Sequence, residues 1–140
     1  MRILVVSQYF WPEIFRINDI VSELVKKGHS VTVLTGIPNY PTGDVFPKFV
    51  ANQTEYYQYD GATIVRVPML TRGKTSLRLV LNYLSYAFIA STYGAFKLRN
   101  QKFDIIFCFQ LSPVTIGIPA IVLRKLKKTP VILQVLDLWT

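Results

Sequence analysis

The hydrophobic pattern at the start of the chain predicts a strand, a helix and a second strand. Ile3 to Val6 form a continuous apolar run, which is typical of a strand buried on both faces of a sheet. Apolar residues then recur at helical spacing from Ile14 to Val25, and Gly28 follows as a left-handed helix end. A second apolar run covers residues 31–35. This order is that of a βαβ unit, which implies parallel strands joined by a right-handed crossover.

The rest of the chain continues this alternation after a loop. Residues 36–50 contain three prolines and two glycines, so we expect a long loop without a helix. A β-hairpin is predicted near residues 55–67, around an Asp-Gly turn. Further elements are a helix over 76–100, a strand over 104–109, a helix opened by Pro113 and a strand over 130–136. The pattern therefore predicts a doubly wound α/β sheet of about five mostly parallel strands.

Two features concern the extent of the domain and its environment. No helix follows the last predicted strand to cover it, so we expect residues 1–140 to be the first part of a longer protein. Residues 79–96 are free of charge and border on basic residues, but their length is at the lower limit for a membrane span. Because Asn82, Ser85 and other polar residues interrupt this segment, we expect a buried helix or one that rests at a membrane interface.

The charge of the chain lies in its second half. Apolar residues make up 51% of the sequence and charged residues 17%, which is typical of a folded domain rather than a disordered chain. The net charge is +8. Basic and acidic residues cancel up to residue 71, whereas ten basic and two acidic residues follow. The second half should therefore meet something negative, such as nucleic acid, anionic lipid or a phosphorylated ligand.

Several classes of site are disfavoured by missing residue types. Cys108 is the one cysteine, which excludes an internal disulfide and is typical of a cytosolic protein. His29 is the one histidine, so we expect no metal site built on cysteine and histidine. There is no glycine between Ser7 and Lys27. This excludes the glycine-rich turn of ordinary NAD and FAD domains after the first strand.

The candidate binding residues follow the carboxyl ends of the predicted strands, where open α/β sheets bind ligands. The first loop contains Tyr9, Phe10 and Trp11, which either pack or contact a ligand. The start of the following helix could present its amides, with Arg16, to an anion. Asn39 and Tyr40 offer an amide and an aromatic face that suit a sugar, although a turn-rich connection would have the same composition. His29 and Asp104 lie at amino ends of strands, and we expect both to be structural.

An ordered set of short motifs resembles one known family. The motifs are Trp11-Pro12-Glu13, Arg16-Ile17-Asn18-Asp19, Gly28-His29-Ser30-Val31, Pro38-Asn39-Tyr40-Pro41, Arg66-Val67-Pro68 and Asp137-Leu138-Trp139. Together they resemble the N-terminal half of retaining GT-B glycosyltransferases of family 4. The similarity is closest to the bacterial branch that acts on N-acetylated amino sugars in O-antigen, capsule or colanic-acid assembly.

The resemblance implies two Rossmann-like domains that face a cleft. Residues 1–140 would be the acceptor-side domain, and a C-terminal domain outside this chain would bind most of the nucleotide-sugar, which serves as co-substrate without a further cofactor. Position by position, the resemblance implies the following roles: Glu13, Arg16 and Asn18 in the acceptor and donor-phosphate loop, Asn39, Tyr40, Gln110 and Ser112 at the acceptor, and Asp137 as a catalytic or acceptor-orienting group. Two departures stand out, because Phe15-Arg16 replaces the usual Gly-Gly and Thr140 replaces the usual closing proline.

The resemblance also offers a partner for the basic half. Acceptors in this branch are polyprenyl-diphosphate-linked saccharides, which places the enzyme in the cytoplasm at the inner face of the cytoplasmic membrane. Basic residues near a membrane contribute about 1 kcal/mol each towards anionic lipid. We expect membrane contact at Arg72, Lys74 and Arg78, with a second basic patch over residues 124–128.

Two other functions remain open from the sequence. One is a complete, non-catalytic basic module that binds an anionic membrane. The other is a natural half-enzyme that assembles with a separate donor-binding subunit. Nucleic acid is not an expected partner, because the basic residues cluster at helix ends and no recognition motif occurs.

Overall fold

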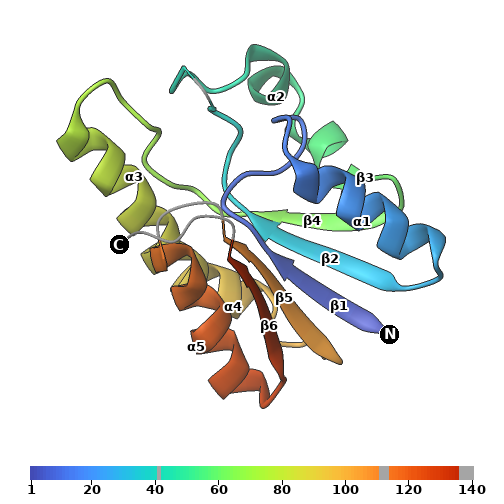
Figure 1. Ribbon diagram of the computed structural model, residues 1–140. Helices are drawn as coiled ribbons and strands as arrows, with labels where there is room; N and C mark the ends of the chain where they lie inside the picture. The colour runs from blue at the N-terminus through green and yellow to red at the C-terminus, as the bar shows by residue number, and fades with distance from the viewer. Residues whose placement is uncertain (41, 111–113, 136–140) are drawn as a thin grey trace.

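Six strands form one sheet in the order β3-β4-β2-β1-β5-β6 (Figure 1). The structure is a computed structural model that describes residues 1–40, 42–110 and 114–135. The strands are β1 (Arg2–Val6), β2 (Ser30–Thr35), β3 (Gln58–Tyr59), β4 (Ala62–Arg66), β5 (Ile105–Gln110) and β6 (Val131–Val135). All pairings are parallel except that of β3 with β4. The predicted doubly wound, mostly parallel α/β fold is confirmed, with one strand more than expected.

Helices cover both faces of the sheet (Figure 1). Their bounds are α1 (Arg16–Lys26), α2 (Pro47–Ala51), α3 (Ser76–Ile89), α4 (Ala95–Lys97) and α5 (Gly117–Lys127). Alternate residues of β1 enter two separate cores. Ile3 and Val5 pack in the α1 core with Val21, whereas Leu4 and Val6 pack in the core formed by α3 and α5. This division explains why β1 is an uninterrupted apolar run.

The hairpin prediction is right about the turn and wrong about the first arm. Asp60 and Gly61 both have positive φ, 46° and 90°, as the tight Asp-Gly hairpin turn requires. The antiparallel partner of β4 is only the two-residue β3. The preceding residues form a 3-10 turn, η1 (Gln53–Tyr56), which holds Tyr56 against the Trp11 ring at a centroid distance of 4.9 Å. Packing of these aromatic rings thus ends the strand early.

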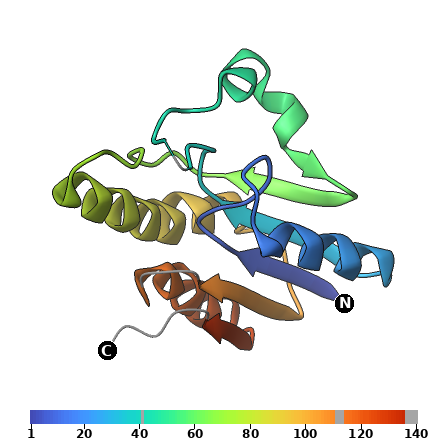
Figure 2. The ribbon, with the colours of Figure 1, turned by 45° about the horizontal axis from the view of Figure 1, so that its top comes forward.

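The expectation that residues 36–50 contain no helix is also wrong. The helix α2 begins inside that range, and Pro47 is its first residue. Proline suits this position because the first helical N–H has no intrahelical partner in any case. Phe49 of α2 is buried and packs edge-on against Tyr56. Figure 2 shows that α2 and η1 lie beyond the β3–β4 edge of the sheet.

The long helix predicted over residues 76–100 consists of three consecutive segments. A π-helical turn, η2 (Ala90–Gly94), separates α3 from the short α4. Within and beside this turn, Ser91 and Thr92 donate hydroxyl hydrogen bonds to the carbonyls of Ala87 and Phe88, which competes with regular helical bonding. Among the described residues, none of the helices is long and apolar enough to cross a membrane.

The helix α5 begins later than predicted. Val114–Ile116 form a 3-10 turn, η3, and α5 starts at Gly117, whereas Pro113 lies outside the described residues. Pro119 lies in the first turn of α5, so its missing N–H costs the helix no hydrogen bond. Lys128 ends the helix in the left-handed conformation with φ of 51°.

Candidate functional site

The candidate site lies at the carboxyl edge of the sheet, around the point where the strand order reverses. The chain leaves β1 towards β2 on one side, and β5 lies on the other side of β1. In open α/β sheets, this topological switch point is where ligands bind. Three segments meet there: the loop after β1, the loop after β2, and the connection from β4 to α3. The site is built from their contacts.

Glu13 holds the first two loops together. Its carboxylate Oε2 accepts hydrogen bonds from the backbone N–H groups of Asn39, at 3.0 Å, and Tyr40, at 2.7 Å. Its Oε1 lies 3.4 Å from the amide nitrogen of Phe10. The side chain is 2% exposed. Glu13 therefore serves as a buried anchor for backbone amides, and little of it is accessible to a ligand.

Burial also changes the acidity of Glu13. Desolvation raises the pKa of this carboxyl to about 7, although the backbone hydrogen bonds and the charge of Arg66 act in the opposite direction. The same burial lowers the pKa of the Arg66 guanidinium to about 10, against the effect of the nearby Glu13 charge. Both groups thus lose hydration free energy on folding.

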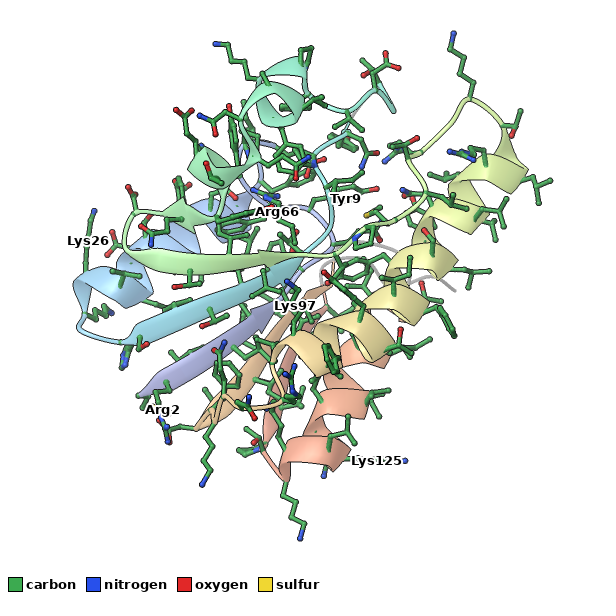
Figure 3. All side chains as sticks on the ribbon, turned by 180° about the vertical axis from the view of Figure 1, so that it is seen from behind. Arg2, Tyr9, Lys26, Arg66, Lys97 and Lys125 are labelled. Atoms are coloured by element: carbon green, nitrogen blue, oxygen red, sulfur yellow. The ribbon has the colours of Figure 1, made fainter. Side chains whose placement is uncertain are left out.

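Arg66 connects three further segments at the end of β4. Its guanidinium donates to the carbonyl oxygens of Tyr56, at 3.0 Å, of Gly36, at 3.1 Å, and of Trp11. Figure 3 shows Arg66 and Tyr9 at this edge of the sheet. Glu13 accepts hydrogen bonds from backbone N–H groups, and Arg66 donates to backbone carbonyl oxygens. Together they fix the loops that follow β1 and β2.

A chain of polar side chains leads from β1 to α3. Gln8 donates its amide to the Asn82 carbonyl oxygen at 2.9 Å, and the Tyr9 hydroxyl donates to the same oxygen at 3.3 Å. The Asn82 amide in turn donates to the carbonyl of Leu70 at 2.6 Å. Gln8 and Asn82 are almost fully buried, and Gln8 Oε1 has no hydrogen-bond partner among the described residues.

Arg72 brings a positive charge to the end of this chain. Its Nη1 donates to the Tyr9 hydroxyl at 3.1 Å, and its guanidinium carbon lies 4.9 Å from the centre of the Tyr40 ring. Burial raises the pKa of Tyr9 above its ordinary value, so the phenol stays protonated. Tyr9 also stacks on Phe15 at a centroid distance of 5.2 Å. The result is a cation that contacts two rings, Tyr9 and Tyr40, of a group of three aromatic rings that pack together.

Close backbone contacts fix the position of Arg72. The backbone N–H of Arg72 donates to the side-chain oxygen Oδ1 of Asn39 at 3.1 Å. Gly43 has φ of 91°, and a Cβ built on it would lie 1.9 Å from the Arg72 carbonyl oxygen. Only glycine permits both this conformation and this approach. The loop after β2 therefore fixes the backbone position of Arg72.

The structure places the sequence-predicted residues in three groups. Asn18 and Asn39 are buried in loop contacts: Asn18 accepts from the Trp11 amide at 2.9 Å and donates to the Glu13 carbonyl at 2.8 Å. Tyr40 is half-buried in the aromatic group, and Arg16 is exposed at the first residue of α1. Gln110 is the last residue of β5, whereas Ser112 and Asp137 lie outside the described residues.

The residues predicted for membrane contact occupy different surroundings. Arg72 lies within the candidate site, where its guanidinium contacts Tyr9 and Tyr40. The Arg78 guanidinium bonds to Thr71, with Nε 2.9 Å from its carbonyl oxygen. Lys74 is exposed. Tyr9, Phe10 and Trp11, left open between packing and binding, all pack: Phe10 is fully buried, and Trp11 stacks on Tyr56 and Tyr59.

Sequence reasoning missed Gln8, Arg66 and Asn82 as members of this site. Asn82 carried a signal, because it interrupts the uncharged segment 79–96 as an amide on a helix. Gln8 carried a weaker one as a polar residue directly after a buried strand. Asp104 accepts from the Arg2 amide at 2.6 Å at the opposite edge of the sheet, in keeping with its expected structural place. No cluster of three potential metal ligands occurs among the described residues.

Comparison with a family model decides the classification. The model of the glycosyl transferase 4-like domain matches residues 15–140. The chain belongs to this family. A search of curated proteins found no match.

Solved structures share the fold of this glycosyl transferase 4-like domain. The glycotransferase of kitacinnamycin is 20% identical over 94% of this chain, with a TM-score of 0.63. CalG4, the calicheamicin glycosyltransferase, is 17% identical over 99% of the chain, with a TM-score of 0.65. The chain covers 30% and 33% of these two proteins, so it spans about a third of their length.

The same fold also occurs outside glycosyltransferases. The C-terminal domain of PF1911 hydrogenase from Pyrococcus furiosus is 14% identical over 95% of this chain and 90% of its own, with a TM-score of 0.60. At such identities the structural likeness shows a Rossmann-like fold alone. The family assignment therefore rests on the match over residues 15–140.

Proposed function

We propose that this chain is the acceptor-side domain of a retaining GT-B glycosyltransferase. In this proposal, the enzyme moves a sugar, an N-acetylated amino sugar, from a nucleotide-sugar to a polyprenyl-diphosphate-linked saccharide during bacterial surface polysaccharide synthesis. A second Rossmann-like domain supplies most of the nucleotide-sugar site. Family membership supports the reaction class, and the cation in contact with two aromatic rings at the switch point is the observation that carries the acceptor side.

The site groups match the chemistry that this reaction needs. Aromatic faces pack against sugar rings, and the half-buried Phe15 and Tyr40, whose ring centroids lie 4.9 Å apart, are the rings that can present such faces. A diphosphate needs cations and N–H donors, which Arg72 and the amides at the start of α1 beside Arg16 can supply. No described side chain caps the start of α1; the backbone amide of Asn18 bonds to the Phe15 carbonyl at 3.0 Å, which leaves the amides of Arg16 and Ile17 for an anion.

The reaction places charge at the leaving diphosphate. The acceptor hydroxyl oxygen bonds to the anomeric carbon of the donor sugar as the bond to the nucleotide diphosphate breaks on the same face, and the hydroxyl proton passes to the departing phosphate oxygen. Arg72 would stabilise the developing negative charge, and rigid loops held by Glu13 and Arg66 would keep it in position. From the family resemblance we assign to Asp137 the orientation of the acceptor hydroxyl, and to Gln110 and Ser112 contacts with the acceptor.

A transfer assay tests this function. The native protein that contains this chain should transfer sugar from a nucleotide-sugar to lipid-linked saccharides extracted from its source cells, as mass spectrometry of the lipid fraction would show. Candidate donors would include UDP-linked N-acetylated amino sugars and their plain hexose counterparts. A product with plain hexoses only would correct the donor class. No product with any donor, although the protein is folded, would contradict the proposal.

A membrane-bound acceptor requires membrane contact, and α3 offers a surface for it. Exposed apolar residues recur on one face of this helix at Leu77, Val80, Leu84 and Phe88. The spacing of three or four residues keeps them on one stripe. Lys74 lies just before the helix and is exposed. A basic residue followed by an apolar stripe is typical of a helix that rests at the interface of an anionic membrane.

We predict that the native protein sediments with anionic vesicles at low salt and not with neutral ones. Phe88→Glu should reduce the bound fraction several-fold, because it places a negative charge in the apolar stripe. Val50→Glu is the matched control, since Val50 is similarly exposed on α2, away from α3. Equal sedimentation with both lipids, or equal loss in both variants, would rule out this contact surface.

A further inference from the structure

A basic cavity lies at the amino edge of the sheet, opposite the candidate site. Its volume is about 570 Å³. Arg2 opens β1, Phe103 precedes β5, and Thr129 precedes β6, so the cavity borders the starts of three neighbouring strands. In Figure 3, Arg2 and Tyr9 mark the two opposite edges. A ligand here would be remote from the transfer reaction.

The charge of this cavity is one-sided. Five of its lining residues are cationic, and none of the lining residues among the described part of the chain is acidic. These cations are Arg2, Arg99, Lys102, Lys127 and Lys128. Asp104, next to the cavity, interacts with Arg2 at 3.8 Å between Oδ1 and Nη2. Arg2 is thus the one cation of the cavity to which the described residues supply a carboxylate partner.

Two of the cations shape the wall of the cavity. The Lys127 ammonium donates to the carbonyls of Leu98, at 2.6 Å, and Gln101, which ties α5 to the turn after α4. Burial lowers the pKa of Lys127, and no carboxylate offsets this among its described contacts. Arg99 folds over the Phe96 ring at 4.0 Å and bonds to the Phe96 carbonyl.

The ammonium groups of Lys102 and Lys128 are available to a ligand. Neither ammonium group has a hydrogen bond or ion pair with another described residue. Lys128 holds a left-handed backbone position at the end of α5, where glycine is the usual residue. The lining also exposes apolar side chains, the half-buried Phe103 and the exposed Leu126. The cavity thus combines free cations with a surface for carbon atoms.

We propose that this cavity binds an organic phosphate ester, with the phosphate between Lys102, Lys128 and Arg2 and its carbon skeleton against Phe103 and Leu126. An oxyanion would offset the repulsion among cations that lie around one hollow, and charge-assisted hydrogen bonds would hold it. The ester could come from a soluble metabolite or from the headgroup of an anionic lipid. Both share the chemistry that the cavity recognises.

A fluorophore in the cavity tests this site in the native protein. Gln101→Cys places a thiol in the lining, whereas the one natural cysteine of this chain, Cys108, is buried and burial raises its pKa to about 12. The labelled protein would be titrated at constant ionic strength with glycerol 3-phosphate and, separately, with vesicles of phosphatidylglycerol or phosphatidylcholine. A saturable response to the soluble ester indicates a metabolite site. A response to phosphatidylglycerol vesicles alone indicates a lipid headgroup.

Matched charge variants complete the test. Lys102→Gln with Lys128→Gln should weaken binding by about tenfold or more, because it removes two charge-assisted contacts. Lys27→Gln with Lys48→Gln removes the same charge from exposed positions elsewhere and should leave binding unchanged. Thermal unfolding of the unlabelled protein with and without each probe checks that the label does not create the signal. No saturable response to either probe, or equal weakening in both double variants, would overturn the proposal.

Discussion

Replacing Glu13 by alanine is expected to lower the free energy of unfolding by about 4 kcal/mol at pH 5 and by about 1 kcal/mol at pH 8. The substitution removes the oxygen that accepts the amides of Asn39 and Tyr40, two bonds in a site where Glu13 is 2% exposed. Each buried donor left without a partner costs about 1–3 kcal/mol. When the carboxyl is neutral, no buried charge offsets this cost, so the loss in unfolding free energy should be largest at low pH.

The pH dependence follows from the raised pKa of Glu13. Burial raises this pKa from 4.5 to about 7, so the folded protein binds a proton more tightly here than the unfolded chain does. The stabilisation is fully present below pH 4.5 and is lost as the pH rises through 7. The shift corresponds to about 3 kcal/mol, which the alanine variant lacks at every pH.

Urea unfolding at several pH values measures both effects. Glu55→Ala serves as the control, because Glu55 is exposed in η1 and should change stability little at any pH. A loss in Glu13→Ala that stays constant or grows from pH 5 to 8 would contradict the prediction. It would mean that the backbone hydrogen bonds and Arg66 keep the carboxyl ionised at low pH.

The layered fold was predictable because each of its signals is local. The apolar run of Ile3 to Val6 marks a strand between two cores, and Gly28, with φ of 91°, ends α1 as expected. The failures have a common cause in long-range packing. The strand after residue 55 is cut short because Tyr56 packs against Trp11, a contact between residues far apart in sequence.

The candidate site was only partly predictable for the same reason. The loop that contains Glu13 was a candidate because it directly follows the first strand, and the site does lie at that edge of the sheet. The partners of Glu13 are backbone amides 26 and 27 residues away, which no local pattern reveals. Gln8 meets Asn82 across 74 residues. In the sequence, Arg72 is followed by Lys74 and Arg78 and was therefore predicted to lie in a basic surface patch. Its contact with the Tyr40 ring is visible only in the folded structure.

Arg72→Met should reduce kcat/KM for sugar transfer by about 100-fold, a typical cost of removing one charge-stabilising donor from an active site. Under the proposed function, Arg72 stabilises the departing diphosphate. Methionine keeps much of the side-chain length and its contact with Tyr40 but removes the charge and the bond to the Tyr9 hydroxyl. Because the charge develops in the transition state, most of the loss should fall on kcat rather than KM.

Two further variants separate this role from a structural one. Arg72→Lys keeps the charge without the planar fork and should recover part of the activity, since lysine still binds phosphate as a point charge. Lys27→Met removes one charge at the exposed end of α1 and should leave kcat unchanged. The melting temperatures of all three variants should stay near that of the parent protein. If Arg72→Met retained full kcat, or if Arg72→Lys were as inactive as Arg72→Met while equally stable, charge stabilisation by Arg72 would be ruled out.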